Sequence, residues 1–242
     1  MSSKSTPANP RGLKDLPFSV PESTPAEKRR AARIVRALGV HYPDAYCELD
    51  HSLPHELLVA TILSAQATDA GVNKATPGLF AAFPEPKDYA ASTPAEIEPY
   101  IKTIGLFRNK AKSVHSAMTA LVERFDGEVP RTMEELLTLR GVARKTASVV
   151  LGNCFGINDG FVVDTHVHRI SQRLGLVDPG RNVQQTERKL MSLMPRKKWC
   201  DLSHQIIFHG RGSCTARGGS CGAHPICKSF GVNCEKRTQP SG

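Results

Sequence analysis

The sequence predicts an all-α protein of about ten short helices, and three observations support this fold class. Helix-start signatures, in which Thr or Asn is followed three residues later by Glu or Gln, occur four times. Apolar residues recur at helical spacing in several segments. No alternating polar and apolar run is long enough for a convincing strand. With 242 residues, 40% of them hydrophobic, the chain can form one large core or two modest ones.

The N-terminal segment divides at Thr24. Residues 1–23 are rich in Ser, Pro and Lys without periodicity, which predicts a flexible, disordered basic tail. Thr24 then precedes Pro25 and Glu27 in a capping box, so we expect a helix to begin there and to reach about Leu38.

Further helices are predicted along the chain in the same way. Helical spacing of apolar residues marks two of them, with the positions Leu57, Leu58, Ile62, Leu63 and Val114, Met118, Leu121, Val122, Phe125. Start signatures mark three more, at Thr93–Glu96, Thr132–Glu135 and Asn182–Gln185.

Residues 132–152, TMEELLTLRGVARKTASVVLG, read as two helices joined by a tight turn at Gly141. The amides of such a turn and of the second helix start point outward and can hold a phosphate, which predicts a helix-hairpin-helix. An ordinary helical hairpin is the alternative. Arg144 and Lys145 stand at the positive end of the helix dipole, a placement that is unfavourable unless an anion binds. That field and partial burial would favour a neutral, nucleophilic amine on Lys145.

Residues 163–166, Val-Asp-Thr-His, precede another helical pattern formed by Val167, Ile170 and Leu174. Asp164 is well placed to cap that helix. A catalytic role would require its carboxylate to face Lys145.

Four of the seven cysteines lie close together near the end of the chain, at Cys214, Cys221, Cys227 and Cys234. The odd total and the lack of a signal peptide argue for a metal site over disulfides and for a cytoplasmic protein. We expect Cys47, Cys154 and Cys200 to be small buried residues.

Basic residues are concentrated at the two ends of the chain. Residues 1–40 carry eight basic and three acidic side chains, and residues 181–242 carry eleven and three, within a net charge of +9. Both ends are therefore expected on one face that binds a polyanion. No apolar stretch is long enough to span a bilayer, so we expect no membrane span, but charge alone does not separate nucleic acid from a membrane surface as the polyanion.

Several motifs together resemble the endonuclease III family. Residues 139–147, LRGVARKTA, are similar to that family's LPGVGRKTA, and residues 163–166 match its VDTH. Residues 63–69, LSAQATD, residues 100–106, YIKTIGL, and residues 209–211, HGR, match three further stretches in the same order. The resemblance extends from about residue 27 to Cys234.

The resemblance implies a two-lobed helix-hairpin-helix DNA glycosylase fold. Residues 47–158 would form a six-helix barrel lobe with the hairpin at about 132–152, and residues 24–46 and 159–236 a metal-cluster lobe. It also implies a monomeric glycosylase and AP lyase that acts on oxidised pyrimidines and abasic sites in duplex DNA. Lys145 would be the nucleophile and Asp164 its catalytic partner.

The family positions that contact DNA also map onto this chain. Gln66 and Leu106 would fill the hole left by an extruded base, although alone they read as a buried helix Gln and a core Leu. The remaining implied DNA contacts are Arg140, Gly141, Ala143, Arg144, His166 and Arg169.

Two departures from the family pattern affect the hairpin and the metal site. Arg140 and Ala143 replace a Pro and a Gly, and an Ala forced to positive φ would carry about 1–2 kcal/mol of strain. The cysteines are separated by six, five and six residues, whereas the family has six, two and five, and His224 stands at the third ligand position. We expect all four cysteines to hold a [4Fe-4S] cluster; zinc is the alternative, and loss of the cluster is a third possibility.

Two other functions remain compatible with the sequence. One is a non-catalytic or weakly active DNA-binding or redox-sensing protein, which would bind duplex DNA without preferring lesions. The other is a glycosylase for mismatched or alkylated bases.

Overall fold

The computed structural model describes residues 12–13, 16–217 and 222–234. Cys221 and most of the predicted tail lie outside these ranges. Residues 16–23 were also placed in the tail, but Leu16 is buried in the core, and Phe18 and Val20 pack against it. Their apolar side chains explain why order begins before Thr24.

The chain divides into two compact units. Among the described residues, the first comprises Cys47–Ile157, and the second combines those of residues 12–46 with those of residues 158–234. We describe each unit by itself.

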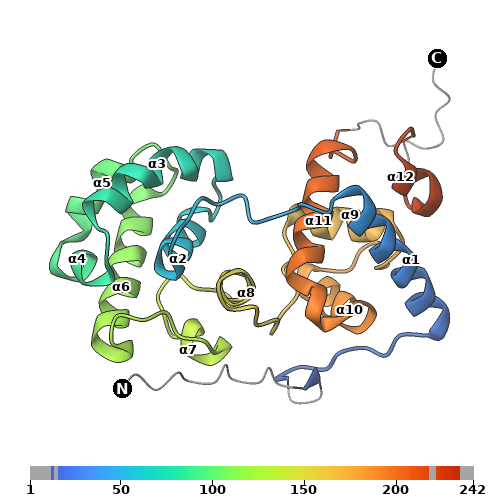
Figure 1. Ribbon diagram of the computed structural model, residues 1–242, viewed down its shortest axis with the longest axis horizontal. Helices are drawn as coiled ribbons and strands as arrows, with labels where there is room; N and C mark the ends of the chain where they lie inside the picture. Colours follow the sequence, from blue (N-terminus) through green and yellow to red (C-terminus); the bar gives the residue numbers. More distant parts are fainter. Residues whose placement is uncertain (1–11, 14–15, 218–221, 235–242) are drawn as a thin grey trace. The chain divides into compact units, whose positions relative to one another are not determined.

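Helix α6 (Phe107–Phe125) is the long helix of the first unit, with α4 (Pro86–Ala91) and α5 (Pro94–Ile101) against it (Figure 1). Helix α2 (Pro54–Leu63) is buried from Leu57 to Leu63 because nearly all of these residues are apolar. It contacts α6 and α8, and thereby supports the helix that carries Lys145. The other helices of this unit are α3 (Asp69–Ala82), α7 (Met133–Leu137) and α8 (Arg144–Phe155).

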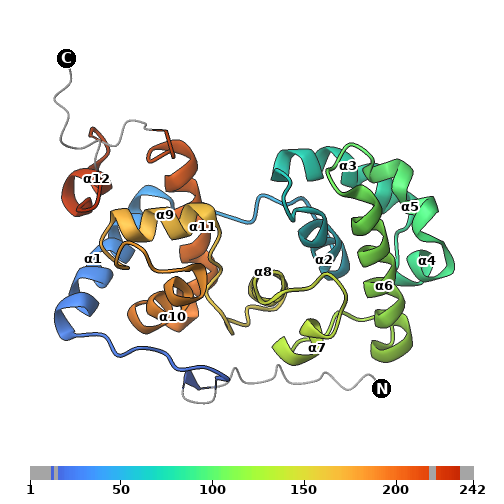
Figure 2. The same cartoon turned by 180° about the vertical axis from the view of Figure 1, so that it is seen from behind.

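The second unit is built from both ends of the chain. Helix α1 (Pro25–His41) packs on α11 (Trp199–Gly212), and α11 packs on α9 (Thr165–Arg173), as Figures 1 and 2 show. Ile34, Trp199 and Ile206 belong to the shared core. The other helices are α10 (Val183–Leu193), the 3-10 turn η2 (Arg196–Lys198) and α12 (Pro225–Phe230).

The described residues contain helices and no strands, which confirms the predicted all-α class. They form twelve α-helices, a few more than the ten predicted. The capping side chains of Thr24, Thr132 and Asn182 each accept a bond from an amide of the first turn, so these three helix starts are confirmed. In the described part of the chain, no helix has the length and apolarity to cross a bilayer.

Candidate functional site

The predicted hairpin is formed by α7, a turn at residues 138–143, and α8. Gly141 has φ +82°, a left-handed conformation that other residues adopt at a cost. A Cβ atom there would lie 2.9 Å from Cβ of Ser113 and 3.4 Å from Cγ2 of Ile62. Only glycine therefore satisfies both the backbone and the space at this turn.

The strain expected at Ala143 is absent. Ala143 has φ −95° and ψ 169°, which is extended backbone, and it is the N-cap residue of α8. Positive φ is confined to Gly141 in this turn, so the expectation that Ala143 distorts the hairpin was wrong.

The N-terminus of α8 lacks the capping side chain that α1, α7 and α10 have. Ala143 supplies no side-chain cap, and the first turn has no acidic residue. Arg144 is half-buried, and Lys145 and Arg140 are exposed. The partial burial expected for Lys145 was wrong. A helix start without a cap, with basic side chains around it, is suited to an anion such as a phosphate.

Gln66 and Leu106 are exposed residues with left-handed backbone. Gln66 has φ 54° between α2 and α3, and Leu106 has φ 61° just before α6. Leu106 is 58% exposed, so it is no core residue, and Gln66 is neither helical nor buried. The structural alternatives for both positions were therefore wrong. Strained non-glycine backbone of this kind is concentrated at functional sites.

Asp164 is the N-cap residue of α9. Its Oδ1 accepts a 2.7 Å hydrogen bond from the Val167 amide, which confirms the predicted cap. The cap uses one carboxylate oxygen and holds the half-buried side chain in a defined direction. Asp164 belongs to the second unit and Lys145 to the first.

Arg169 links α9 to the end of α11 and to Cys214. Its Nη2 donates to the carbonyl oxygens of Gly210, at 2.9 Å, and Cys214, at 3.0 Å. The same nitrogen lies 3.3 Å from Nδ1 of His166. A Cβ at Gly210 would come within 3.1 Å of the His166 Cβ, so α9 and α11 approach closely here. The side chains of His166 and Arg169 thus help to position the segment that carries Cys214. Their contacts with DNA stay predictions.

A buried group of His209, Cys214 and Cys227 could hold a metal ion. Their candidate ligand atoms all lie within 4.8 Å of one another. Cys214 lies just after α11, and Cys227 lies in α12. Cys234 is half-buried against the same core, and Cys221 lies outside the described residues.

The thiol of Cys214 has a basic neighbour. Arg173 donates to its Sγ at 3.2 Å. A hydrogen bond with the Cys227 thiol, together with Arg173, lowers the Cys214 pKa to about 6. A thiolate is the form that binds metals, so this environment suits a metal ligand.

Sequence reasoning missed His209 and Tyr42 in this group. His209 Nε2 lies 3.4 Å from Cys227 Sγ, and His209 Nδ1 lies 2.9 Å from the Tyr42 hydroxyl. His209 was recognised only as part of the HGR stretch. The available signal was its place five residues before Cys214, with imidazole as a common metal ligand.

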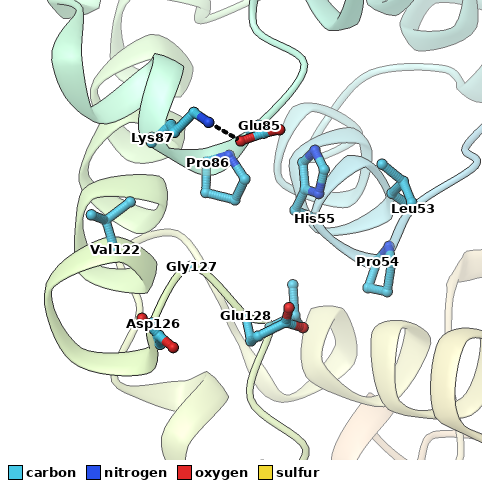
Figure 3. A pocket seen from close by; sticks show the side chains of 11 residues that line it. Leu53, Pro54, His55, Glu85, Pro86, Lys87, Val122, Asp126, Gly127 and Glu128 are labelled. Carbon is cyan, nitrogen blue, oxygen red and sulfur yellow. Dashed lines mark ion pairs between the residues drawn. The ribbon is translucent and has the colours of Figure 1, made fainter. Parts of the chain in front are cut away.

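One cavity of the first unit contains none of the predicted site residues. It has a volume of about 450 Å³, and His55, Pro86 and Val129 are among its lining residues (Figure 3). Its charged side chains include Glu85 and Lys87, which pair with each other at 2.5 Å. The geometry places the hairpin residues elsewhere on this unit.

Comparison with known proteins gives a consistent result. Residues 59–196 match the model of the HhH-GPD superfamily base excision DNA repair protein. The chain is 54% identical over 200 residues to Endonuclease III of Synechocystis sp., a match that covers 81% of this chain and 90% of that protein.

Two solved structures are similar to the whole fold. A non-covalent Endonuclease III–DNA complex matches with a TM-score of 0.81 and 41% identity, covering 87% of this chain and 97% of that one. A trapped covalent Endonuclease III–DNA intermediate matches with a TM-score of 0.82 and 40% identity, covering 88% and 99%. The chain therefore belongs to the endonuclease III family, within the HhH-GPD superfamily of base excision DNA repair proteins.

Proposed function

We propose that this base excision repair glycosylase and lyase removes oxidised pyrimidines from duplex DNA and cleaves the strand at the resulting abasic site, with Lys145 as its nucleophile. The observation that carries the proposal is the exposed primary amine of Lys145 in the first turn of α8, at a helix start that has no side-chain cap. A phosphate held by the hairpin amides would bring the sugar of a neighbouring nucleotide to this amine.

The chemistry requires a nucleophile that forms a Schiff base. The Lys145 amine attacks C1′ of the sugar, the damaged base leaves, and the sugar ring opens to give an imine. Loss of a proton from C2′ then expels the 3′ phosphate by β-elimination, and water releases the lysine. The carboxylate of Asp164 would accept the proton from the lysine amine and stabilise positive charge that develops on the sugar.

Access to the base requires that it leave the helical stack. Extrusion costs a few kcal/mol and costs least for weakly stacked, damaged bases. The exposed side chains of Gln66 and Leu106 are suited to occupy the vacated space, one as a polar plug and the other as an apolar wedge. Arg140 and Arg144 flank the hairpin turn and would bind phosphates.

The cysteine group would be a structural metal centre close to the basic C-terminal region. A [4Fe-4S] cluster on Cys214, Cys221, Cys227 and Cys234 and a zinc ion were the two predicted forms, and both require deprotonated thiols. The 3.2 Å hydrogen bond from Arg173 to Cys214 Sγ favours the thiolate form and supports metal binding of either kind. We further propose that the protein acts as a monomer in the bacterial cytoplasm.

The substrate class can be tested by incubating the full chain with matched duplexes that contain thymine glycol, 8-oxoguanine, a G·T mismatch or an undamaged pair. We expect base release and a β-elimination product from thymine glycol at a rate at least tenfold above the other duplexes. Preference for the mismatch would contradict the substrate assignment. Binding of all duplexes without any base release would contradict the enzymatic proposal and support a non-catalytic DNA-binding protein.

A further inference from the structure

The buried Cys/His group differs from the site expected of the family in the separation of its ligand atoms. In a [4Fe-4S] cluster each thiolate binds a different iron atom, so the ligands surround a bulky cubane. Here one imidazole nitrogen and two sulfurs all lie within 4.8 Å of one another. Ligands that share one tetrahedral zinc ion stand about 3.5–3.8 Å apart, since Zn–S and Zn–N bonds are about 2.3 and 2.0 Å long. His209 Nε2 and Cys227 Sγ, 3.4 Å apart, match such a pair, and the group, whose ligand atoms are all within 4.8 Å of one another, is compact enough for a single ion.

We propose that His209, Cys214 and Cys227 bind one zinc ion, in place of the four-cysteine iron–sulfur cluster that the family resemblance implies. All three residues are buried, with exposed fractions of 0%, 3% and 6%. Two thiolates balance the charge of Zn²⁺, and a neutral imidazole adds none. The three side chains would supply three of the four ligands that zinc takes, and a further ligand would complete the set.

The hydrogen bonds around His209 orient its ring for this role. Nε2 lies toward the sulfur of Cys227, at 3.4 Å, while Nδ1 lies 2.9 Å from the Tyr42 hydroxyl. Zinc-binding histidines characteristically donate through the ring nitrogen that does not bind the metal. If Nδ1 carries the proton and donates to Tyr42, the lone pair of Nε2 is left for zinc.

His224 supports this assignment of protons. Its Nδ1 accepts a 3.2 Å hydrogen bond from the Ile226 amide, so a neutral ring carries its proton on Nε2. That nitrogen lies 3.3 Å from the Tyr42 hydroxyl and can donate to it. The hydroxyl can in turn donate to Ser213 Oγ, at 3.4 Å. Because the one lone pair of its neutral ring, on Nδ1, already accepts from the Ile226 amide, we assign His224 a positioning role beside the ion.

Arg173 completes the surroundings of the two sulfurs. Its Nη1 donates to Cys214 Sγ at 3.2 Å and to the Thr215 carbonyl at 2.9 Å. An N–H donor to a sulfur stabilises the thiolate that zinc requires. The site therefore has its ligands, a partner for the imidazole and a partner for one thiolate within a single unit.

Metal analysis of the wild-type protein is the first test. The full chain should be produced without a polyhistidine tag in medium that contains both iron and zinc, and purified without oxygen. We expect about one zinc ion per chain and a colourless solution. About four iron atoms per chain with a brown colour, or a chain that holds neither metal, would overturn the proposal.

X-ray absorption at the zinc edge tests the ligands directly, with no substitution. We expect a coordination shell that contains both sulfur and nitrogen, with the multiple-scattering signature of an imidazole. A shell of four sulfurs would overturn the role of His209.

Variants then separate ligation from general damage to the fold. His209→Ala should reduce the zinc content at least tenfold, whereas Cys200→Ala, a change at a half-buried residue elsewhere in α11, should retain it. Tyr42→Phe removes only the partner of Nδ1 and should weaken zinc affinity about 10–100-fold. Tyr46→Phe is the matched control and should leave the affinity unchanged. Equal zinc affinity in Tyr42→Phe and the wild type would contradict the assigned geometry, and none of these measurements depends on DNA cleavage.

Discussion

At the scale of single residues, three non-glycine positions in the described chain have left-handed backbone: Gln66, Leu106 and Asp126. Asp126 follows α6 as its C-cap residue, where this conformation ends a helix. Neither Gln66 nor Leu106 is the C-cap residue of a helix, and both side chains are exposed. This strained backbone supports the DNA-contacting role that we propose for both side chains.

Leu106→Gly separates stability from function. Glycine adopts left-handed backbone without the Cβ penalty, so we expect the free energy of unfolding to rise by about 1 kcal/mol. Loss of the wedge should weaken binding to lesion DNA about tenfold or more. Burial of an inserted Leu side chain contributes about 1.5–3 kcal/mol to the binding free energy. Chemical denaturation and DNA titration measure the two effects.

Asp126→Gly is the control, since it relieves the same conformation at the other end of α6. It should raise stability slightly and leave DNA binding unchanged. If both variants bind lesion DNA as the wild type does, Leu106 is not the wedge.

Gly141→Ala tests the hairpin. The added Cβ would meet Ser113 at 2.9 Å on backbone with φ +82°, and we expect the protein to lose about 2–3 kcal/mol of stability. Gly78 lies within α3, and Gly78→Ala places its Cβ an ordinary 3.6 Å from the Tyr100 ring, so this control should gain about 0.5–1 kcal/mol of stability. Equal denaturation midpoints for the two variants would show that the turn tolerates a side chain.

At the scale of elements, α8 begins without a capping side chain and with exposed basic residues around its first turn. Arg140→Ala should lower DNA affinity and reduce the slope of log affinity against log salt by about one, because one phosphate contact is lost. Lys87→Ala is the control: it removes an exposed charge of the same unit that already pairs with Glu85. If salt titrations give the same slope for Arg140→Ala and the wild type, Arg140 does not contact a DNA phosphate.

Local sequence chemistry predicted some helix starts well and missed others. Thr24, Thr132 and Asn182 cap their helices as expected because a side chain satisfies the first amides. Helix α3 has a capping Thr68 but no Glu three residues later, and it contains Pro77. Helix α11 begins at Trp199, and its N-cap residue Lys198 supplies no side-chain cap, so packing in the core determines this helix.

For the candidate site, too, local sequence motifs predicted some features and missed others. Motifs identified Lys145, Gln66 and Leu106, but the backbone conformations of Gln66, Leu106 and Ala143 depend on how the connecting turns close. The imidazole of His209 was missed because Tyr42, from the opposite end of the chain, positions it. Contacts between distant segments are not encoded in local spacing.

At the scale of the whole molecule, the chain divides into a unit with the hairpin and a unit with the Cys/His group. Because zinc binding contributes to folding, its removal should destabilise the unit that holds it. After treatment with a strong zinc chelator, we expect amide hydrogen exchange to accelerate in α9, α11 and α12 and to change little in α2 and α6. Uniform acceleration, or none, would contradict a structural metal in the second unit.

The central claim is that Lys145 forms the covalent intermediate, and borohydride trapping measures this most directly. The full chain is incubated with an abasic-site duplex and sodium borohydride, and the adduct is located by peptide mass spectrometry. We expect one adduct on Lys145, which disappears in Lys145→Arg, a variant that keeps the positive charge but has no primary amine. An adduct on another lysine, or full trapping in Lys145→Arg, would contradict the claim.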